Sequence, residues 1–325
     1  MAFYDVKGQD RAIELLLGSF LSQRVSHAYL FYGPEGVGKH KVATLFAQLL
    51  NCEHPLDGKE PCQTCGSCRK ISSGSHPDII TVKPEGASIK IAQMRMMQER
   101  AFYKCYEGRI KVIMVEEAQL LTSEAANSLL KILEEPPRDT LFILMTQDTR
   151  KLPLTVLSRC QGIPFTWLSD DDIADIFAQQ GLEVRIPLVL AQGSMGKALV
   201  LNEKTKLSAL IQEVGKMLAE LKNSGYHEIF SQVEKLEKDK ELVSLTLEIL
   251  AAHYRDQLIR EINRPGGQND TATLFALEEI TKVDYYLKSN ANTRLVLEVL
   301  LINLRNIERG ERGYNPDGKS SGSQI

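Results

Sequence analysis

Long hydrophobic runs are missing from this sequence of 325 residues, because no stretch of about 18 uncharged apolar residues occurs in it. The first residues, Met1 to Gln9, also lack the basic segment and the apolar core of an export signal. We therefore expect a cytoplasmic protein without a membrane partner.

An excess of positive charge is missing as well. The chain has 39 Lys and Arg against 42 Asp and Glu, which gives a net charge of −3. This balance excludes a basic field over the whole chain that would draw it onto nucleic acid, so any contact with DNA must be local or made through partner proteins. Hydrophobic residues make up 43% of the chain, enough for two or three domains with full cores.

Short apolar segments alternate with helical periodicity in the first half of the chain. These segments are residues 28–32, 79–82, 110–115 and 141–145. Such alternation favours an α/β fold, in which a parallel sheet is covered by helices on both faces. We expect this domain to span residues 1–165.

The pattern changes to helical periodicity alone after residue 165. Ser169 is followed by three aspartates, which is typical of a helix start, and we expect this helix to end near Gln180. A second helix is expected over residues 186–192. The two helices predict a small helical lid domain over residues 166–205.

Helical periodicity then continues to residue 309 and predicts an all-α domain over residues 206–309. The expected helices are 207–223, 226–236, 240–263, 271–289 and 293–308. Residues 310–325 are rich in Gly, Ser, Pro and charge, and we expect them to be a disordered tail.

A phosphate-binding loop follows the first apolar segment. Gly33, Gly36, Gly38 and Lys39 lie in the sequence Gly-Pro-Glu-Gly-Val-Gly-Lys, the pattern in which backbone N–H groups and a lysine hold phosphates. His40 follows where the pattern requires a Ser or Thr oxygen for Mg²⁺, and Mg²⁺ prefers hard oxygen ligands to nitrogen. The sequence therefore predicts a nucleotide-hydrolase scaffold with impaired hydrolysis. Lys39 is compatible with weak nucleotide binding or with none.

Two glutamates follow the third apolar segment. P-loop enzymes place an Asp at the position of Glu116 to hold Mg²⁺, and a Glu at the position of Glu117 to orient the attacking water. Glu116 is one methylene longer than Asp, and Mg²⁺ tolerates distorted octahedral geometry poorly. ATP and Mg²⁺ are therefore doubtful ligands of this chain's own site. The alternative is that both glutamates are only the polar end of a buried strand.

Four cysteines form a tight cluster between the loop and the second apolar segment. Cys52, Cys62, Cys65 and Cys68 follow the pattern C-x9-C-x2-C-x2-C, which is typical of a structural zinc site with four thiolate ligands. We expect one Zn²⁺ per chain. The alternative is four free thiols in a flexible insertion, and Cys105 stands apart as a buried or incidental thiol.

Longer motifs in the same chain resemble a known family. They are residues 27–31 (HAYLF), 127–137 (NSLLKILEEPP), 154–160 (LTVLSRC) and 290–295 (NANTRL), together with the loop and the cysteine cluster. On these residues the chain resembles the delta-prime family of clamp-loader subunits of bacterial DNA polymerase III, which are AAA+ proteins. The motifs span nearly the whole chain except its tail.

The resemblance implies a three-domain subunit of a five-membered ring with gamma/tau and delta subunits. The ring opens a sliding clamp and places it on primed DNA as part of a DNA-directed DNA polymerase, a nucleotidyltransferase. The helices of residues 206–309 would form the collar through which subunits assemble. Ser158, Arg159 and Cys160 match the family's arginine finger, which reaches the γ-phosphate bound by a neighbouring subunit. Without the resemblance, Arg159 would be interpreted as a surface residue in a loop.

The chain also departs from the relatives that hydrolyse ATP. They carry Gly-Ser-Met-Arg where this chain has Gly-Ser-Met-Gly at residues 193–196, so the arginine of the second sensor is absent. Thr146 matches the first sensor, although a capping role explains it equally well. We therefore expect no ATP hydrolysis by this chain alone. The alternative is an active motor subunit of the gamma/tau type in which His40 and Glu116 bind metal after all.

Overall fold

The computed structural model describes residues 2–204, 207–262, 271–289 and 291–310. The chain divides into two compact units, the first made of residues up to 184 and 191–200, the second of 185–190 and the described residues from 201 onward. The boundaries expected at 165 and 205 stay predictions. The expected tail lies outside the described residues except for Gly310.

The first unit is built on a five-stranded parallel sheet in the order β2-β3-β4-β1-β5. The strands are β1 (Ala28–Tyr32), β2 (Ile79–Val82), β3 (Lys111–Val115), β4 (Thr140–Thr146) and β5 (Gln161–Pro164). This arrangement confirms the predicted parallel α/β sheet and four of its strands. The sequence did not predict β5, because Gln161 and Gly162 are exposed at the sheet edge and break the apolar pattern.

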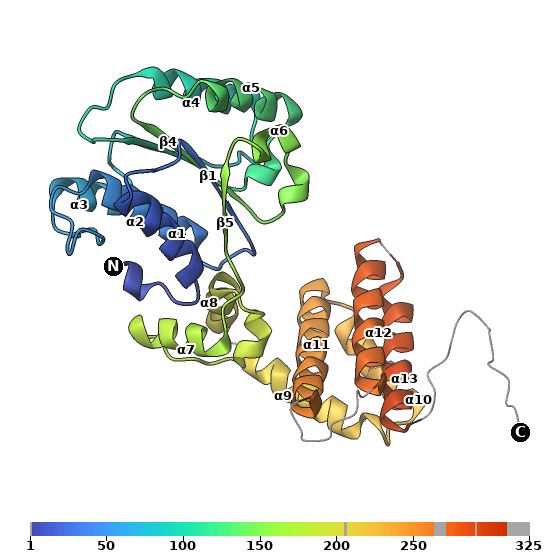
Figure 1. Ribbon diagram of the computed structural model, residues 1–325. Helices are drawn as coiled ribbons and strands as arrows, with labels where there is room; N and C mark the ends of the chain where they lie inside the picture. The colour runs from blue at the N-terminus through green and yellow to red at the C-terminus, as the bar shows by residue number, and fades with distance from the viewer. Residues whose placement is uncertain (1, 205–206, 263–270, 290, 311–325) are drawn as a thin grey trace, which may run out of the picture. The chain divides into compact units, whose positions relative to one another are not determined.

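Helices cover both faces of this sheet (Figure 1). On one face lie α1 (Asp10–Leu21) and α2 (Lys39–Asn51), with α3 (Gly66–Ser72) against α2; on the other lie α4 (Ile91–Phe102), α5 (Ser123–Glu134) and α6 (Leu154–Leu157). Strand β1 shows how one segment serves both layers. Tyr29 and Phe31 pack with α1 and α2, whereas Ala28 and Leu30 pack on the opposite face, as the period of two in a strand requires.

The first unit also contains α7 (Asp170–Gln179). Ser169 begins it as predicted: its Oγ accepts a hydrogen bond from the Asp172 N–H at 3.0 Å, and the Asp172 carboxylate accepts one from the Ser169 N–H at 3.1 Å. This reciprocal pairing satisfies two N–H groups that the helix start leaves free.

The helix expected over residues 186–192 is wrong. The structure has only a 3₁₀ turn, Leu188–Ala191, followed by the helix α8 (Met195–Glu203), which the sequence did not predict. The physical reason lies between the two elements. Gln192 and Gly193 both adopt left-handed backbone angles, with φ of 52° and 74°, and these end the turn before a helix can extend.

The second unit is helical in its described residues. Its helices are α9 (Leu207–Leu221), α10 (Tyr226–Leu236), α11 (Lys240–Ile262), α12 (Thr271–Lys288) and α13 (Thr293–Glu308). All five predicted helices are confirmed to within two residues at each end. Their apolar faces share one core that includes Leu221, Leu250 and Leu304. None of the described helices combines the length and hydropathy that a bilayer span requires.

The packing of α5 gives a first testable prediction. Leu129 is fully buried between α5 and the sheet, and Leu129→Ala should lower the free energy of unfolding by about 2–5 kcal/mol, because the site cannot collapse around the lost atoms. Urea denaturation followed by circular dichroism and by fluorescence of Trp167, the single tryptophan, measures the change. Asn127→Ala, at an exposed position of the same helix, is the control and should change it by less than about 0.5 kcal/mol. Equal effects of the two variants would contradict this packing.

Candidate nucleotide cleft, exposed arginine and metal centre

A cleft of about 420 Å³ lies in the first unit, next to the ends of strands β1, β3 and β4. The residues that line it come from segments far apart in the sequence: residues 35–41 of the loop and the start of α2, Glu116, Glu117, Gln119, Thr146, Leu168 before α7, Ile176 on α7, and Met195 and Gly196 on α8. The structure therefore brings together most of the nucleotide-site residues that the sequence predicted. Arg159 does not line this cleft.

The loop conformation depends on glycine at two positions. Gly33 has φ of 146°, and a Cβ there would lie 2.2 Å from the carbonyl oxygen of Phe165. Gly36 has φ of 71°, and a Cβ there would lie 2.2 Å from the Ser194 Oγ. Any other residue at either position would be strained and would also clash. The loop thus keeps the tight turn that phosphate binding requires.

Lys39 begins α2 and reaches back across this loop. Its Nζ donates a hydrogen bond to the Gly33 carbonyl at 2.6 Å and another to the Pro34 carbonyl. Burial lowers the pKa of Lys39 to about 8, and the nearby Glu35 carboxylate opposes this effect. The lysine is therefore still mostly charged at pH 7, and its own loop satisfies two of its N–H donors.

Glu116 contacts a histidine and a lysine side chain instead of facing an open metal position. Its Oε1 lies 3.0 Å from His40 Nδ1 and 3.2 Å from Lys83 Nζ. Both contacts are within ion-pair distance, but neither is aligned as a good hydrogen bond. The His40 side chain, followed by Lys83, holds the pKa of Glu116 below its usual range, although burial acts in the opposite direction. The carboxylate is thus ionised and shared between two groups of the protein.

These contacts test whether Mg²⁺ fits the site. In a P-loop enzyme the hydroxyl after the lysine and an aspartate supply hard oxygens to the ion. Here those two positions, His40 and Glu116, contact each other, and Lys83 places a third side chain on the same oxygen. The residues present do not fit the magnesium site of a P-loop enzyme. Lys83 was not predicted from the sequence. It could have been found from its position directly after β2, because β2 lies beside β3, the strand that leads to Glu116.

Thr146 lies at the end of β4 and makes polar contacts on two sides. Its Oγ1 lies 3.0 Å from Gln119 Oε1 and 3.1 Å from the Asp148 carbonyl, and it accepts a hydrogen bond from the Asp148 N–H at 3.2 Å. The contacts with Asp148 are those of a local turn, whereas Gln119 reaches Thr146 from the 3₁₀ helix Ala118–Leu120. Gln119 was not predicted from the sequence. Glu117, which precedes this 3₁₀ helix, is exposed and has a left-handed φ of 49°, a strained backbone of the kind that clusters at functional sites.

Helix α8 begins directly against the phosphate-binding loop. The Gly196 N–H donates a hydrogen bond to the Gly36 carbonyl at 3.3 Å. A Cβ at residue 196 would lie 3.2 Å from the Gly36 Cα, so a larger side chain there would force the loop to shift. Residue 196, where the family resemblance predicted the missing arginine, makes close backbone packing here instead.

Arg159 lies just after α6 and its side chain is one-third exposed. Its Nη1 donates a hydrogen bond to the Thr155 carbonyl at 2.9 Å, and its Nη2 forms an ion pair with Glu134, the last residue of α5. Ser158 is exposed, and its Oγ donates a hydrogen bond to the same carbonyl at 3.2 Å. Burial raises the pKa of the Cys160 thiol to about 12, and this side chain packs against the core below α4 and α5. Of the three predicted residues, only Arg159 presents a charge to solvent.

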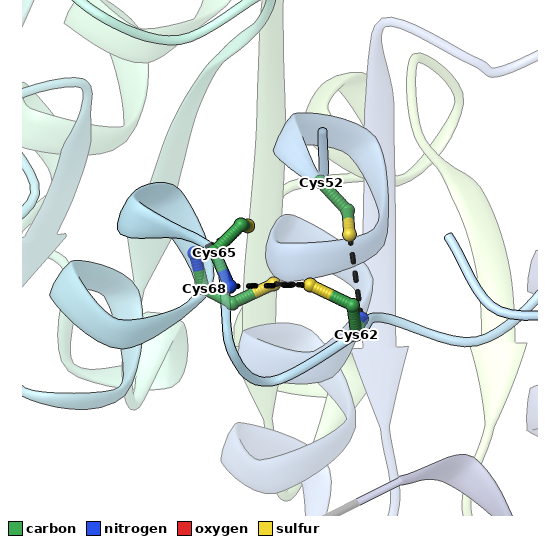
Figure 2. A group of neighbouring side chains, drawn as sticks. All are labelled: Cys52, Cys62, Cys65 and Cys68. Carbon is green, nitrogen blue, oxygen red and sulfur yellow. Dashed lines mark hydrogen bonds between the residues drawn. The ribbon is translucent and has the colours of Figure 1, made fainter. Parts of the chain in front are cut away.

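Four cysteines converge at the other end of α2 (Figure 2). Their sulfur atoms all lie within 4.8 Å of one another, and those of Cys62 and Cys68 are 4.0 Å apart. Four ligands about 2.3 Å from one zinc ion would stand about 3.8 Å apart, so the cluster fits a tetrahedral ion. Cys52 follows the end of α2, and Cys65 precedes the start of α3. The four cysteines form a site that could bind a metal ion, with no position left for substrate.

The surrounding side chains attach this module to the core. Gln48 Nε2 on α2 donates a hydrogen bond to the Cys68 carbonyl at 2.9 Å. Ser67 Oγ and the buried His76 Nε2 lie 3.0 Å apart. These contacts join α3 to α2 and to the segment before β2, and they hold the cysteines in place. Neither Gln48 nor His76 was predicted from the sequence, because a single Gln or His belongs to no motif with a fixed spacing.

The family model described as "DNA polymerase III, delta subunit" matches residues 8–169 of this chain. The curated DNA polymerase III subunit delta' of Bacillus subtilis is 35% identical to it over 259 residues, which cover 78% of each chain.

Two longer relatives match as well. The DNA polymerase III subunit tau/gamma of Haemophilus influenzae is 36% identical over 211 residues and the subunit tau of Bacillus subtilis is 38% identical over 172 residues. These matches cover 62% and 53% of this chain, and about 30% of the length of each of those two relatives. The delta' relative, by contrast, is matched over more than two-thirds of both chains. The chain therefore belongs to the delta' subunit family of DNA polymerase III.

Proposed function

We propose that this chain is the delta' member of a clamp loader, that it hydrolyses no ATP itself, and that it supplies Arg159 to ATP bound by a neighbouring subunit. Its partners would be gamma/tau and delta subunits in a five-membered ring that places a sliding clamp on primed DNA. The observation that carries the proposal is the contrast between two sites. Glu116 is occupied by His40 and Lys83, whereas the guanidinium of Arg159 is partly exposed outside the cleft.

The chemistry of Arg159 supports its role toward a neighbouring subunit. A guanidinium keeps its charge at any physiological pH, and its planar fork matches the oxygens of a phosphate. Its position after the short helix α6, next to the exposed Leu154 and Thr155, makes it accessible to another protein. Such arginine fingers raise the rate of phosphoryl transfer by about 10³ to 10⁵.

The cleft supports the absence of hydrolysis in the chain's own site. Glu116 already contacts His40 and Lys83, the hydroxyl ligand is replaced by His40, and Gly196 stands where a sensor arginine would lie. Lys39 and the glycine loop preserve the shape of a phosphate site without its metal chemistry. We propose that this part of the chain acts as a scaffold.

The second unit supports assembly with partner helices. Its described helices α12 and α13 expose Tyr285, Tyr286, Leu295 and Val299, apolar surface that a subunit interface would cover. We propose that this unit is the collar domain through which the loader assembles. For the cysteine cluster we propose structural zinc, because four closed thiolate ligands are typical of that ion.

Loss of the arginine is the first test of the proposed function. In a reconstituted loader, Arg159→Ala should lower ATP hydrolysis at the adjoining site by about 10³ and reduce clamp loading, because no other group stabilises the transition-state charge from that side. Phosphate release and clamp-loading assays measure both rates. Arg11→Ala, an exposed arginine on α1, is the control. Unchanged rates in the Arg159 variant would refute the role in trans.

The chain's own cleft gives the second test. The purified chain with ATP and Mg²⁺ should turn over at least about a hundredfold more slowly than the ~1 s⁻¹ of a slow ordinary enzyme, because no metal position is available at Glu116. A coupled ADP-release assay measures this rate, with the reconstituted loader as the positive control. Hydrolysis by the isolated chain at ordinary rates would instead identify it as a motor subunit.

The metal centre gives the third test. Protein purified under reducing conditions should contain one zinc ion per chain by inductively coupled plasma mass spectrometry. Cys68→Ala should lose the ion, because three thiolates leave the tetrahedral site incomplete. Cys105→Ala removes a thiol outside the cluster and should retain it. Metal-free protein would show that the four thiols are free, and retention of the ion by Cys68→Ala would show that the proposed four-cysteine site does not hold it.

A further inference from the structure

The guanidinium of Arg159 is held by two separate elements of the first unit. Glu134 reaches it from the end of α5, and the Thr155 carbonyl reaches it from α6. Among the described residues, Glu134 is the carboxylate that pairs with Arg159. The arginine side chain is long and flexible, and an unheld guanidinium would sample many orientations. In this structure the two contacts hold the guanidinium in a single orientation.

Both anchors are attached to the same rigid core. Leu129 and Leu133 of α5 and Val156 of α6 are buried together against one face of the sheet. Helix α5 ends at Glu134 because Pro136 and Pro137 follow it. Glu134 therefore lies at a fixed point next to Arg159, and it is not part of a mobile loop.

The contacts leave part of the guanidinium free. An arginine has five N–H donors, of which one is directed to Glu134 and one to Thr155. A third contact, to Ser158 Oγ, is long at 3.5 Å. The remaining donors on a one-third exposed side chain are sufficient for a bidentate contact with phosphate oxygens. Glu134 and a phosphate can thus bind the same guanidinium at once.

The ion pair adds little to folding stability. Glu134 is half exposed, and exposed ion pairs contribute little to the free energy of unfolding because water and salt screen them. The contact between Glu134 and Arg159 is better suited to orienting the arginine. A supporting residue at a metal site orients a ligand in the same way.

We propose that Glu134 is a positioning residue for the arginine finger: it fixes the guanidinium so that its free N–H groups face the triphosphate bound by the neighbouring subunit. This inference rests on the proposed function of Arg159. The carboxylate acts through Arg159 and does not itself contact the nucleotide. The alternative is that Glu134 competes with the triphosphate for the arginine, and the two roles predict opposite effects on the rate.

The test uses the complete reconstituted loader with Glu134→Ala and Glu134→Gln in this chain. We expect Glu134→Ala to lower kcat for ATP hydrolysis about tenfold with little change in KM, because the arginine loses its orientation and acts in the transition state. Glu134→Gln keeps an oxygen that accepts the Arg159 hydrogen bond and should stay within about threefold of the original rate. Glu124→Ala is the control, because this exposed glutamate lies at the other end of α5, about 15 Å away at 1.5 Å per residue.

A double variant separates this inference from the proposed function. In the background of Arg159→Ala, the Glu134→Ala change should have no further effect on kcat, because its partner is gone. If Arg159→Ala alone leaves the rate unchanged, the proposed function fails. If Arg159→Ala lowers the rate but Glu134→Ala leaves it unchanged or raises it, only the positioning role fails. The positioning role also fails if Glu134→Gln is as slow as Glu134→Ala. Thermal unfolding and gel filtration of each variant chain confirm that it folds and assembles.

Discussion

The parallel pairing of β1, β4 and β3 is the constraint on which the rest of this protein depends. Parallel strands end at the same edge of a sheet, so the loop after β1, Glu116 after β3 and Thr146 at the end of β4 are delivered to one cleft. The strands are buried on both faces by two helical layers. Fixed strands leave little freedom for the polar residues that follow them, and small changes in those residues therefore decide what the cleft can bind.

The contacts of Glu116 show how such a change acts. A carboxylate at this edge of the sheet needs positive charge, since a partly buried anion without a partner is costly. In a hydrolysing enzyme the metal ion supplies it, whereas here His40 and Lys83 lie against the same oxygen. His40 in place of Ser or Thr, and Glu116 in place of Asp, are local changes that leave the strands and the glycine loop in place. The scaffold therefore keeps the fold of a nucleotide site around residues that do not fit the magnesium site of a P-loop enzyme.

Much of this arrangement could be predicted from the sequence, because the signals are periodic or have fixed spacing. Apolar segments predicted four of the five strands, the cysteine spacing predicted the cluster of sulfurs, and helical periodicity predicted α9 to α13. Strand β5 escaped because a short edge strand with Gln161 and Gly162 lacks an apolar pattern. The helix expected over residues 186–192 is a short 3₁₀ turn instead, which ends at the left-handed backbone of Gln192 and Gly193. For a related reason the sequence did not predict roles for Lys83, Gln119 and Glu134. The role of a single polar residue depends on its contacts with residues that are distant in the sequence.

The cleft and Arg159 are held by different elements of the first unit. Residues of the cleft contact the loop, Lys83 and the start of α8, whereas Arg159 is held by Glu134 and Thr155 from α5 and α6. The two sites share the sheet but no side-chain contact among the described residues. Substitutions at His40 or Glu116 therefore leave the environment of Arg159 unchanged, since sites without shared partners vary independently. Under the proposed function, a chain whose own cleft lacks the usual metal ligands can therefore still present the guanidinium of Arg159 to a neighbouring subunit.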